Sequence, residues 1–427
     1  MRGLLLALAC LTVLAAAPAE RASAVSSCAV SPATSAGYWH TAGNRILDSQ
    51  GRLVRIAAIN WYGMEDQYFV PEGLAQQPLD VLLARVHTLG FNTIRLAFSN
   101  EMVEKNPKVT AHLDANPALK GLHALAVLDQ IVAAAGRQNL RIILENHRSS
   151  VGQDPDESGL WYTARYPERA WIHDWQVLAA RYKNNPTVVG FDLRNEPHTR
   201  PPGPWSLRTY LRQGATWGPY RGHDSAATDW RLAAERAGNA VLAINRNVLI
   251  VVEGIQQYPD RSQATGVDAS WWGSILNPAG TYPVRLKVAH RLVYSPHEYG
   301  PTKYPMRWFG PHMRYSTLLS VWKAHWAYLD AASPSSSVPI LIGEFGTCGT
   351  NAGCVQSSVP GSQGFWFSSL MQYLTTHPEV GWAFWALDAV NPHGKVMTNY
   401  VLQPDWTTVR LPALIDAFHA VEAAPCR

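Results

Sequence analysis

The chain reads TVVGFDLRNEPH over residues 187–198 and PILIGEFG over residues 339–346. Each stretch is a short apolar run that ends near a glutamate, Glu196 or Glu344, with a proline or a glycine close behind it. Such a run predicts a buried parallel strand that carries an acid at its carboxyl end. Two such strands in one parallel sheet predict a pair of carboxylates that face the same cleft.

Strand and helix patterns alternate along the rest of the chain. Eight apolar runs separated by amphipathic helical patterns predict a single α/β domain, a (β/α)8 TIM barrel with extended active-site loops. The expected strands are 54–60, 92–97, 140–145, 187–194, 247–253, 292–297, 338–343 and 380–386. The expected helices are 79–89, 122–138, 171–182, 230–245, 315–331, 364–377 and 412–421. A long loop is expected between residues 253 and 292, where Trp, Gly and Pro replace a helical pattern.

The first 24 residues have the pattern of a secretory signal peptide. Arg2 is followed by an apolar run over residues 4–17 and by small residues at 22–24. This run is too short for a membrane span, and no later stretch approaches the ~18 apolar residues that a span needs. We therefore expect residues 1–24 to be removed and residues 25–427 to form a secreted, extracellular catalytic domain that is free of the membrane.

Four cysteines remain after this segment, and an even number in an oxidising compartment predicts two disulfides. Cys348 and Cys354 flank a short loop just beyond Glu344, so they are expected to pair. Cys28 and Cys426 would then join the two ends of the chain. No C-x-x-C pair is present, which argues against a site in which these thiolates bind a metal, and we expect no metal.

The charge of the chain argues against nucleic acid as a partner. The formal charge is +4, from 36 Lys and Arg against 32 Asp and Glu, and no run of basic residues marks a nucleic-acid surface. The chain holds 17 Trp and 17 Tyr, side chains that suit a ligand with flat apolar faces. We expect a monomer that binds no nucleic acid.

The predicted pair of glutamates fits glycosidic-bond hydrolysis. Retaining hydrolysis uses one protonated carboxyl as acid and one ionised carboxylate as nucleophile, about 5–5.5 Å apart. Other strand ends carry supporting groups: Arg95 can keep a nearby carboxylate ionised, and Tyr299 can donate a hydrogen bond to that same carboxylate. Asn195 can hold a sugar hydroxyl, and Trp385 can offer its ring face to the sugar's C–H groups.

On segments 38–41, 59–63, 92–96, 190–198, 229–243 and 341–346, the chain resembles the catalytic domain of glycoside hydrolase family 5 (clan A) endoglucanases, and most of all the secreted cellulases of actinobacteria. The resemblance extends over residues 38–421. It implies that Glu196 is the general acid/base and Glu344 the nucleophile, that Trp61 stacks on sugar, and that no cofactor is needed. It also places six further residues in the active site: Arg95, His147, Asn195, His297, Tyr299 and Trp385.

The expected activity is that of a retaining endo-β-1,4-glucanase, which cleaves internal bonds of cellulose-type glucans by double displacement. A mannanase, a xyloglucanase or another β-glycanase remains an alternative, because this scaffold changes specificity through its loops. A non-catalytic carbohydrate-binding barrel is a more distant alternative. The mechanism needs Glu196 protonated and Glu344 ionised in the resting protein, so we expect the pKa of Glu196 to be raised.

Overall fold

The structure is a computed structural model that describes residues 36–152, 154, 158–200, 205–222, 225–330, 337–390, 395 and 400–423. The predicted signal peptide over residues 1–24 lies outside the described residues, as does the start of the predicted domain over residues 25–427. Cys28 and Cys426 also lie outside them. The signal peptide, the domain boundary and the second disulfide therefore stay predictions.

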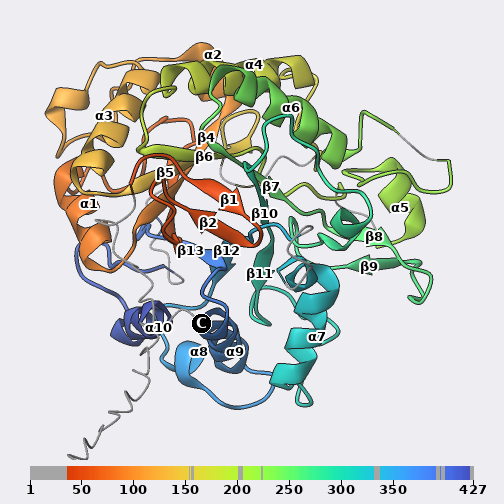
Figure 1. Cartoon of the computed structure of the whole chain (residues 1–427). Coiled ribbons are helices and arrows are strands. Elements are labelled where there is room, and N and C mark those ends of the chain that lie inside the picture. The colour runs from red at the N-terminus through yellow and green to blue at the C-terminus, as the bar shows by residue number, and fades with distance from the viewer. Residues whose placement is uncertain are drawn as a thin grey trace, which may run out of the picture.

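A barrel of parallel strands occupies the centre of the molecule, with helices arranged around it (Figure 1). The strands are hydrogen bonded in the order β10-β7-β6-β5-β4-β3-β13-β12-β11. Their bounds are β3 (Ala57–Met64), β4 (Thr93–Ser99), β5 (Arg141–Arg148), β6 (Val188–Asp192), β7 (Leu249–Glu253), β10 (Leu292–Ser295), β11 (His297–Tyr299), β12 (Leu341–Gly346) and β13 (Gly381–Phe384).

Strands β10 and β11 are the two halves of the predicted sixth strand. Only Pro296 separates them, and proline interrupts a strand ladder because it has no N–H group to donate. β10 pairs with β7, and β11 pairs with β12. A further parallel bridge joins Tyr294 to Ile340, the residue before β12, so the ring of strands is closed. The predicted (β/α)8 barrel is confirmed.

Helices follow most of the strands at the predicted places. The longer helices are α1 (Leu79–Thr88), α3 (Ala124–Arg137), α4 (Glu168–Arg181), α6 (Trp230–Ile244), α7 (Tyr315–His325), α9 (Gln363–Thr376) and α10 (Pro412–Glu422). The shorter ones are α2 (Asn100–Lys105), α5 (Leu207–Arg212) and α8 (Gly353–Gln356). All residues between β7 and β10 are described, and they form the antiparallel pair β8 (Gln257–Pro259) and β9 (Val267–Ala269) with no α-helix, as predicted.

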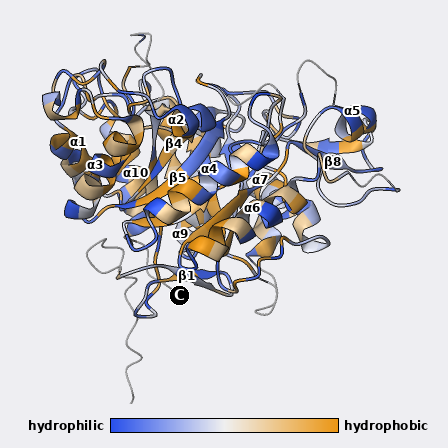
Figure 2. Cartoon of the chain, turned by 90° about the horizontal axis from the view of Figure 1, so that it is seen from above, coloured by the Kyte–Doolittle hydropathy of each residue, from blue (hydrophilic) through white to orange (hydrophobic). Residues whose placement is uncertain are grey.

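The strands separate two apolar layers. Along β7, Leu249 and Val251 belong to the cluster inside the barrel, whereas Ile250 and Val252 belong to the cluster between the strands and the helices. Figure 2 shows both hydrophobic and hydrophilic colours on outer helices such as α4 and α6, as expected for helices that pack one face on a barrel. Among the described residues, no helix has the length and apolar character that crossing a membrane requires.

The strand pair β1 (His40–Ala42) and β2 (Arg45–Leu47) adds to the inner layer near the amino-terminal ends of the barrel strands. Trp39, Ile46 and Val54 from this segment join the inner cluster, and Trp39 is only 1% exposed. The inner layer is therefore apolar at this end of the barrel, which leaves polar side chains to collect at the carboxyl ends.

Trp39→Ala is expected to lower the free energy of unfolding by about 3–5 kcal/mol, because it removes a large buried side chain from the inner layer. Val81→Ala in α1 is the control, since Val81 is 44% exposed and its truncation should cost less than about 0.5 kcal/mol. Chemical denaturation measures both variants. Equal losses of stability would contradict this account of the inner layer.

Candidate active site

Glu196 and Glu344 meet at the carboxyl ends of the barrel strands. One oxygen of each carboxylate and one ring nitrogen of His297 all lie within 4.8 Å of one another. Nδ1 of His297 is 3.0 Å from Oε1 of Glu196 and 3.6 Å from Oε2 of Glu344. The side chain of Glu344 is 5% exposed and that of Glu196 is 12% exposed. The two stretches that predicted a pair of facing carboxylates thus come together in the fold.

Arg95 lies at the centre of the site, and its side chain has no exposure to solvent. In β4, Ile94 and Leu96 pack outward against the helices, whereas Arg95 points into the barrel. Its Nε donates to Asp192 at 2.9 Å, and its Nη2 donates to Glu253 at 2.8 Å. Burial alone would lower the pKa of Arg95, but the surrounding carboxylates raise it well above its usual value.

Two donors hold the carboxylate of Glu344. Nη1 of Arg95 donates to Oε1 at 2.9 Å, and the hydroxyl of Tyr299 donates to Oε2 at 2.8 Å. Burial and the charge of Glu344 raise the pKa of Tyr299 well above its usual value, so the phenol keeps the proton that it donates. Arg95 also donates from Nη2 to Oδ1 of Asn195 at 3.0 Å, which fixes the orientation of this amide next to Glu196.

Glu196 is held by its backbone as well as by its side chain. Its φ angle is +50°, in the left-handed region that favours glycine. Its N–H donates to Oε2 of Glu253 at 2.7 Å, and its carbonyl oxygen accepts from Nδ1 of His198 at 2.7 Å. The residue therefore takes an unfavoured backbone conformation that hydrogen bonds on both sides stabilise.

The predicted rise in the pKa of Glu196 is wrong for this ligand-free structure. Burial alone would raise this pKa, but the hydrogen bond from His297 and the positive charge of its ring outweigh burial and lower it. Burial opposes the charge of His297 too, yet Glu253 and Glu344 raise the pKa of His297 well above its usual value. The prediction followed from the protonation states that the mechanism needs, and the sequence did not show that His297 would lie between three carboxylates.

An aromatic wall lies beside the carboxylates. The Trp385 ring is nearly parallel to those of Tyr62 and His147, with centroids 5.6 Å and 5.7 Å away and interplanar angles of 17° and 18°. Trp385 is partly exposed, whereas His147 is buried with its Nδ1 3.1 Å from Oε2 of Glu145. Burial opposes the charge of His147, but Glu145 raises its pKa to about 9. The wall offers the flat apolar face predicted for Trp385.

Trp61 does not belong to this wall, and its prediction as a sugar-stacking residue is corrected by the structure. Trp61 is 0% exposed, packs in the outer cluster and donates from Nε1 to the carbonyl oxygen of Glu72 at 2.9 Å. Successive side chains of a strand point to opposite faces. Its neighbours in β3 therefore face the site: Asn60 accepts from Nη1 of Arg95 at 2.9 Å, and Tyr62 stacks on the aromatic wall.

The sequence predictions missed three acids that lie beside Arg95. Glu145 is 3.7 Å from Nη1 of Arg95, and the other two, Asp192 and Glu253, accept hydrogen bonds from it. Each is the last residue of its strand, β6 or β7. A signal for Glu253 was present in the sequence, because Leu249, Val251 and Glu253 alternate along one strand face and therefore point to the same side.

The same side chains are the group best suited to hold a metal. Within the part of the chain that the structure describes, Glu196, His297 and Glu344 place possible ligand atoms close together. Hydrogen bonds among these residues, and from Arg95 and Tyr299, already engage those atoms. That the site uses no metal and no cofactor stays a prediction.

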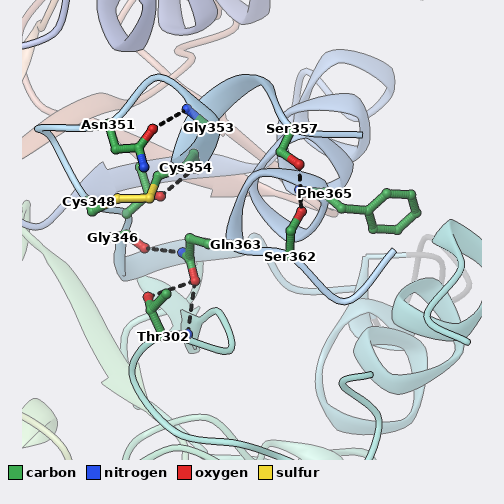
Figure 3. Close-up of a disulfide and its surroundings, with 11 residues drawn as sticks. Thr302, Gly346, Cys348, Asn351, Gly353, Cys354, Ser357, Ser362, Gln363 and Phe365 are labelled. Carbon is green, nitrogen blue, oxygen red and sulfur yellow. Dashed lines mark hydrogen bonds between the residues drawn. A yellow bond between two sulfur atoms is a disulfide. The ribbon is translucent and has the colours of Figure 1, made fainter. Parts of the chain in front are cut away.

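The predicted disulfide between Cys348 and Cys354 is confirmed, with Cα atoms 5.7 Å apart just beyond β12 (Figure 3). A second tether comes from α9, where Nε2 of Gln363 donates to the carbonyl oxygen of Gly346 at 3.3 Å. Oε1 of Gln363 accepts from the hydroxyl of Thr302 at 2.8 Å. The loop that follows Glu344 is therefore tied both covalently and by hydrogen bonds.

A parallel barrel with two carboxylates a few ångströms apart at the carboxyl ends of its strands, beside an aromatic wall, defines a glycoside hydrolase. Comparison with known families agrees and makes the class more specific. Residues 47–391 match the family described as cellulase (glycosyl hydrolase family 5). The chain belongs to this family.

Individual relatives are similar over most of the chain. The chain is 37% identical over 377 residues to an endoglucanase of Paenibacillus polymyxa, covering 88% of this chain and 85% of that protein. It is 31% identical over 371 residues to the major extracellular endoglucanase of Xanthomonas campestris pv. campestris, covering 86% of this chain and 67% of that protein. A crystal structure of a Pyrococcus horikoshii endocellulase in complex with cellotetraose matches with a TM-score of 0.77 and 30% identity, covering 91% of this chain and 99% of that one.

The place of Trp61 in the outer layer predicts that Trp61→Phe lowers stability by about 1 kcal/mol, mainly through the lost hydrogen bond to Glu72, and leaves KM within about twofold. Trp385→Ala should instead reduce kcat/KM by about 10-fold or more, because it removes the exposed face of the wall. Thermal unfolding and steady-state kinetics on a soluble polysaccharide separate the two effects. A raised KM in folded Trp61→Phe would contradict the correction made above.

Replacement of both Cys348 and Cys354 by Ser should lower the free energy of unfolding by roughly 2 kcal/mol, the loop-closure entropy expected for so short a loop. The kcat at moderate temperature should stay within about twofold, since Gln363 still holds Gly346. A reductant added to this double variant then reports on any other disulfide, including the predicted Cys28–Cys426 bond. An unchanged melting temperature in the double variant would show that the Cys348–Cys354 bond adds no stability.

Proposed function

We propose that this chain is a retaining endo-β-1,4-glucanase that hydrolyses internal bonds of cellulose-type glucans, with Glu344 as nucleophile and Glu196 as general acid/base. The observation that carries the proposal is the proximity of the two carboxylates, which bring oxygens within 4.8 Å of each other. Carboxyl groups about 5–5.5 Å apart act on one anomeric carbon in turn, whereas inverting enzymes keep them about 6.5–9.5 Å apart to admit a water between them.

In the first step, Glu344 attacks the anomeric carbon and the bond to the leaving oxygen breaks. The environment of Glu344 suits this role, because donors from Arg95 and Tyr299 hold both oxygens in place. Attack forms a glycosyl ester on Glu344, and the leaving oxygen takes a proton from Glu196. Ester formation removes the negative charge of Glu344, so one fewer carboxylate balances the positive charge of Arg95. This imbalance favours the later hydrolysis of the ester, which restores the carboxylate.

The proton for the leaving group belongs to the Glu196–His297 pair. Nδ1 of His297 lies 3.0 Å from Oε1 of Glu196, and the carboxylates around His297 raise its pKa well above its usual value, which favours an imidazolium that donates to Glu196. A sugar bound against Glu196 displaces water from the exposed part of its carboxylate, and loss of solvation disfavours the ion pair. Transfer of the proton to Glu196 leaves both groups neutral and creates the acid that the first step requires.

In the second step, Glu196 accepts a proton from a water molecule that attacks the ester on Glu344. The sugar leaves with its original anomeric configuration, and Glu344 returns to its ionised form. The Glu196–His297 pair regains the proton that it gave in the first step. The cycle therefore needs no oxidant, metal or cofactor.

The choice of a β-1,4-glucan rests on the relatives and on the wall. The similar proteins from Paenibacillus polymyxa and Xanthomonas campestris are endoglucanases, and the similar Pyrococcus horikoshii enzyme binds cellotetraose. The partly exposed ring of Trp385 offers a flat surface to a pyranose ring. We propose further that the protein acts outside the cell after removal of residues 1–24, as a monomer with polysaccharide as its only partner.

Replacing each glutamate separately tests the two roles. Glu344→Ala and Glu196→Ala should each lower kcat on a glucan by about 10⁴-fold or more. With an activated aryl cellobioside, added azide should give the α-glycosyl azide with Glu344→Ala and the β-glycosyl azide with Glu196→Ala, because azide replaces the nucleophile in one variant and the attacking water in the other. The opposite pattern would exchange the two roles, and an inverted product from the unmodified enzyme would exclude the mechanism.

Glu298→Gln is the matched control, since Glu298 is also a buried glutamate, next to His297 in β11, but accepts from Nε1 of Trp326 at 2.8 Å in the outer layer. Its kcat should stay within about twofold of the unmodified enzyme. Reducing-sugar release from carboxymethylcellulose, mannan and xyloglucan then tests the substrate. Fastest release from mannan or xyloglucan would replace the proposed substrate, and no release from any of the three would favour a non-catalytic barrel.

A further inference from the structure

We propose that Glu253 is a positioning residue for this reaction, which holds Glu196 in its catalytic orientation and keeps His297 protonated. The inference rests on the proposed roles of Glu196 and Glu344. Glu253 is the last residue of β7, which lies between β6, the strand that leads to Glu196, and β10, the strand that ends just before Pro296 and His297. It is not among the residues for which the sequence suggested a role.

Three nitrogen atoms lie within 3.2 Å of the two oxygens of Glu253. The backbone N–H of Glu196 donates to Oε2 at 2.7 Å, and Nη2 of Arg95 donates to Oε1 at 2.8 Å. Nε2 of His297 lies 3.2 Å from Oε1. The side chain of Glu253 has no exposure to solvent. Burial raises the pKa of Glu253, whereas the charges of His297 and Arg95 oppose that rise. Each carboxyl oxygen has at least one nitrogen neighbour to which it can serve as an acceptor.

The bond to the backbone of Glu196 has a mechanical role. Glu196 has a φ angle of +50°, which costs conformational energy for a residue with a Cβ atom. A charged acceptor at 2.7 Å from its N–H offsets that cost and fixes where the side chain starts. Gly273 leaves room for the carboxylate, because a Cβ atom added at Gly273 would lie 2.6 Å from Oε2 of Glu253. If Glu253 served only as an ion-pair partner of Arg95, it would need neither the hydrogen bond from Glu196 nor the space beside Gly273.

The charge of Glu253 has an electrostatic role. His297 lies between Glu196 on its Nδ1 side and Glu253 on its Nε2 side, and only the imidazolium carries a hydrogen on both nitrogens. The other charged groups that face Glu253 are Arg95 from β4 and Glu344 from β12. Asp192 from β6 also faces it. Glu253 is the first of the carboxylates that raise the pKa of His297, while burial opposes that rise.

Glu253→Gln and Glu253→Asp separate the two roles. Glu253→Gln keeps the size of the side chain but removes its charge, so kcat should fall by about 10–100-fold and the basic limb of the kcat/KM profile should move by about one unit to lower pH. The sign follows because an uncharged neighbour lowers the pKa of His297, and the Glu196–His297 pair then loses its proton at lower pH. Glu253→Asp keeps the charge, but the shorter side chain no longer reaches the backbone N–H of Glu196. We therefore expect kcat to fall while the basic limb of the kcat/KM profile stays at the same pH.

The titration of His297 gives a readout that does not depend on activity. In protein labelled at histidine, the NMR signal of His297 is assigned by its loss in His297→Gln. Its midpoint should move to lower pH in Glu253→Gln and stay in place in Glu253→Asp and in the Glu298→Gln control. If the unmodified enzyme were inactive on glucans while these shifts appeared, the proposed function would fail and the coupling of Glu253 to His297 would stand.

The proposal would be overturned if Glu253→Gln had the same kcat as the unmodified enzyme and the same basic limb in its kcat/KM profile. A loss of kcat with an unmoved His297 titration would also overturn it, because Glu253 would then only support the fold. Should Glu253→Gln not fold, Gly273→Ala displaces the carboxylate while the residue remains. That variant should lower kcat, and full activity in it would reject the positioning role.

Discussion

The guanidinium of Arg95 is the group on which the arrangement of the site depends. A cation without solvent exposure is costly unless its charge and its N–H groups are matched by partners. The partners come from several strands of the barrel: Asn60 of β3, Asp192 of β6, Asn195 after β6, Glu253 of β7 and Glu344 of β12. Each partner is directed at a fixed, planar set of donors. The barrel therefore aligns the carboxyl ends of its strands by satisfying one buried charge.

This arrangement gives two glutamates different chemistry. Glu344 accepts directly from Arg95 and from Tyr299, and its carboxylate is fixed at both oxygens. Glu196 does not touch Arg95 and shares a proton with His297 instead, while part of its side chain remains exposed. A nucleophile needs a stable negative charge, and an acid/base group needs a proton that can move. The two glutamates differ in chemistry because different strand ends supply the side chains that contact each of them.

Local sequence patterns carried most of the fold. The runs around Glu196 and Glu344 formed strands β6 and β12, and the helix-poor segment before Leu292 formed β8 and β9 instead of a helix. The predictions that were wrong concerned residues whose environment depends on contacts across the barrel. Trp61 was assigned to the wrong face of β3, although the strand itself was correct, because a shift of one residue exchanges the two faces. The pKa of Glu196 depends on His297, which is 101 residues away along the chain.

The barrel also shows how strained and charged groups are tolerated. The same strands that end in acids begin with apolar residues, as in β7, where Leu249 and Val251 precede Glu253 on the inner face. The apolar part packs on the segment around Trp39, and the outer faces pack on the helices, so most of the stability comes from residues away from the site. In β12 the pairing with β13 shifts register between Ile342 and Phe345, around Glu344. Such an irregularity redirects a side chain. Because the apolar layers do not depend on the polar one, the polar layer can keep the unfavoured backbone of Glu196 and a cluster of closely spaced charged groups that serve chemistry rather than folding.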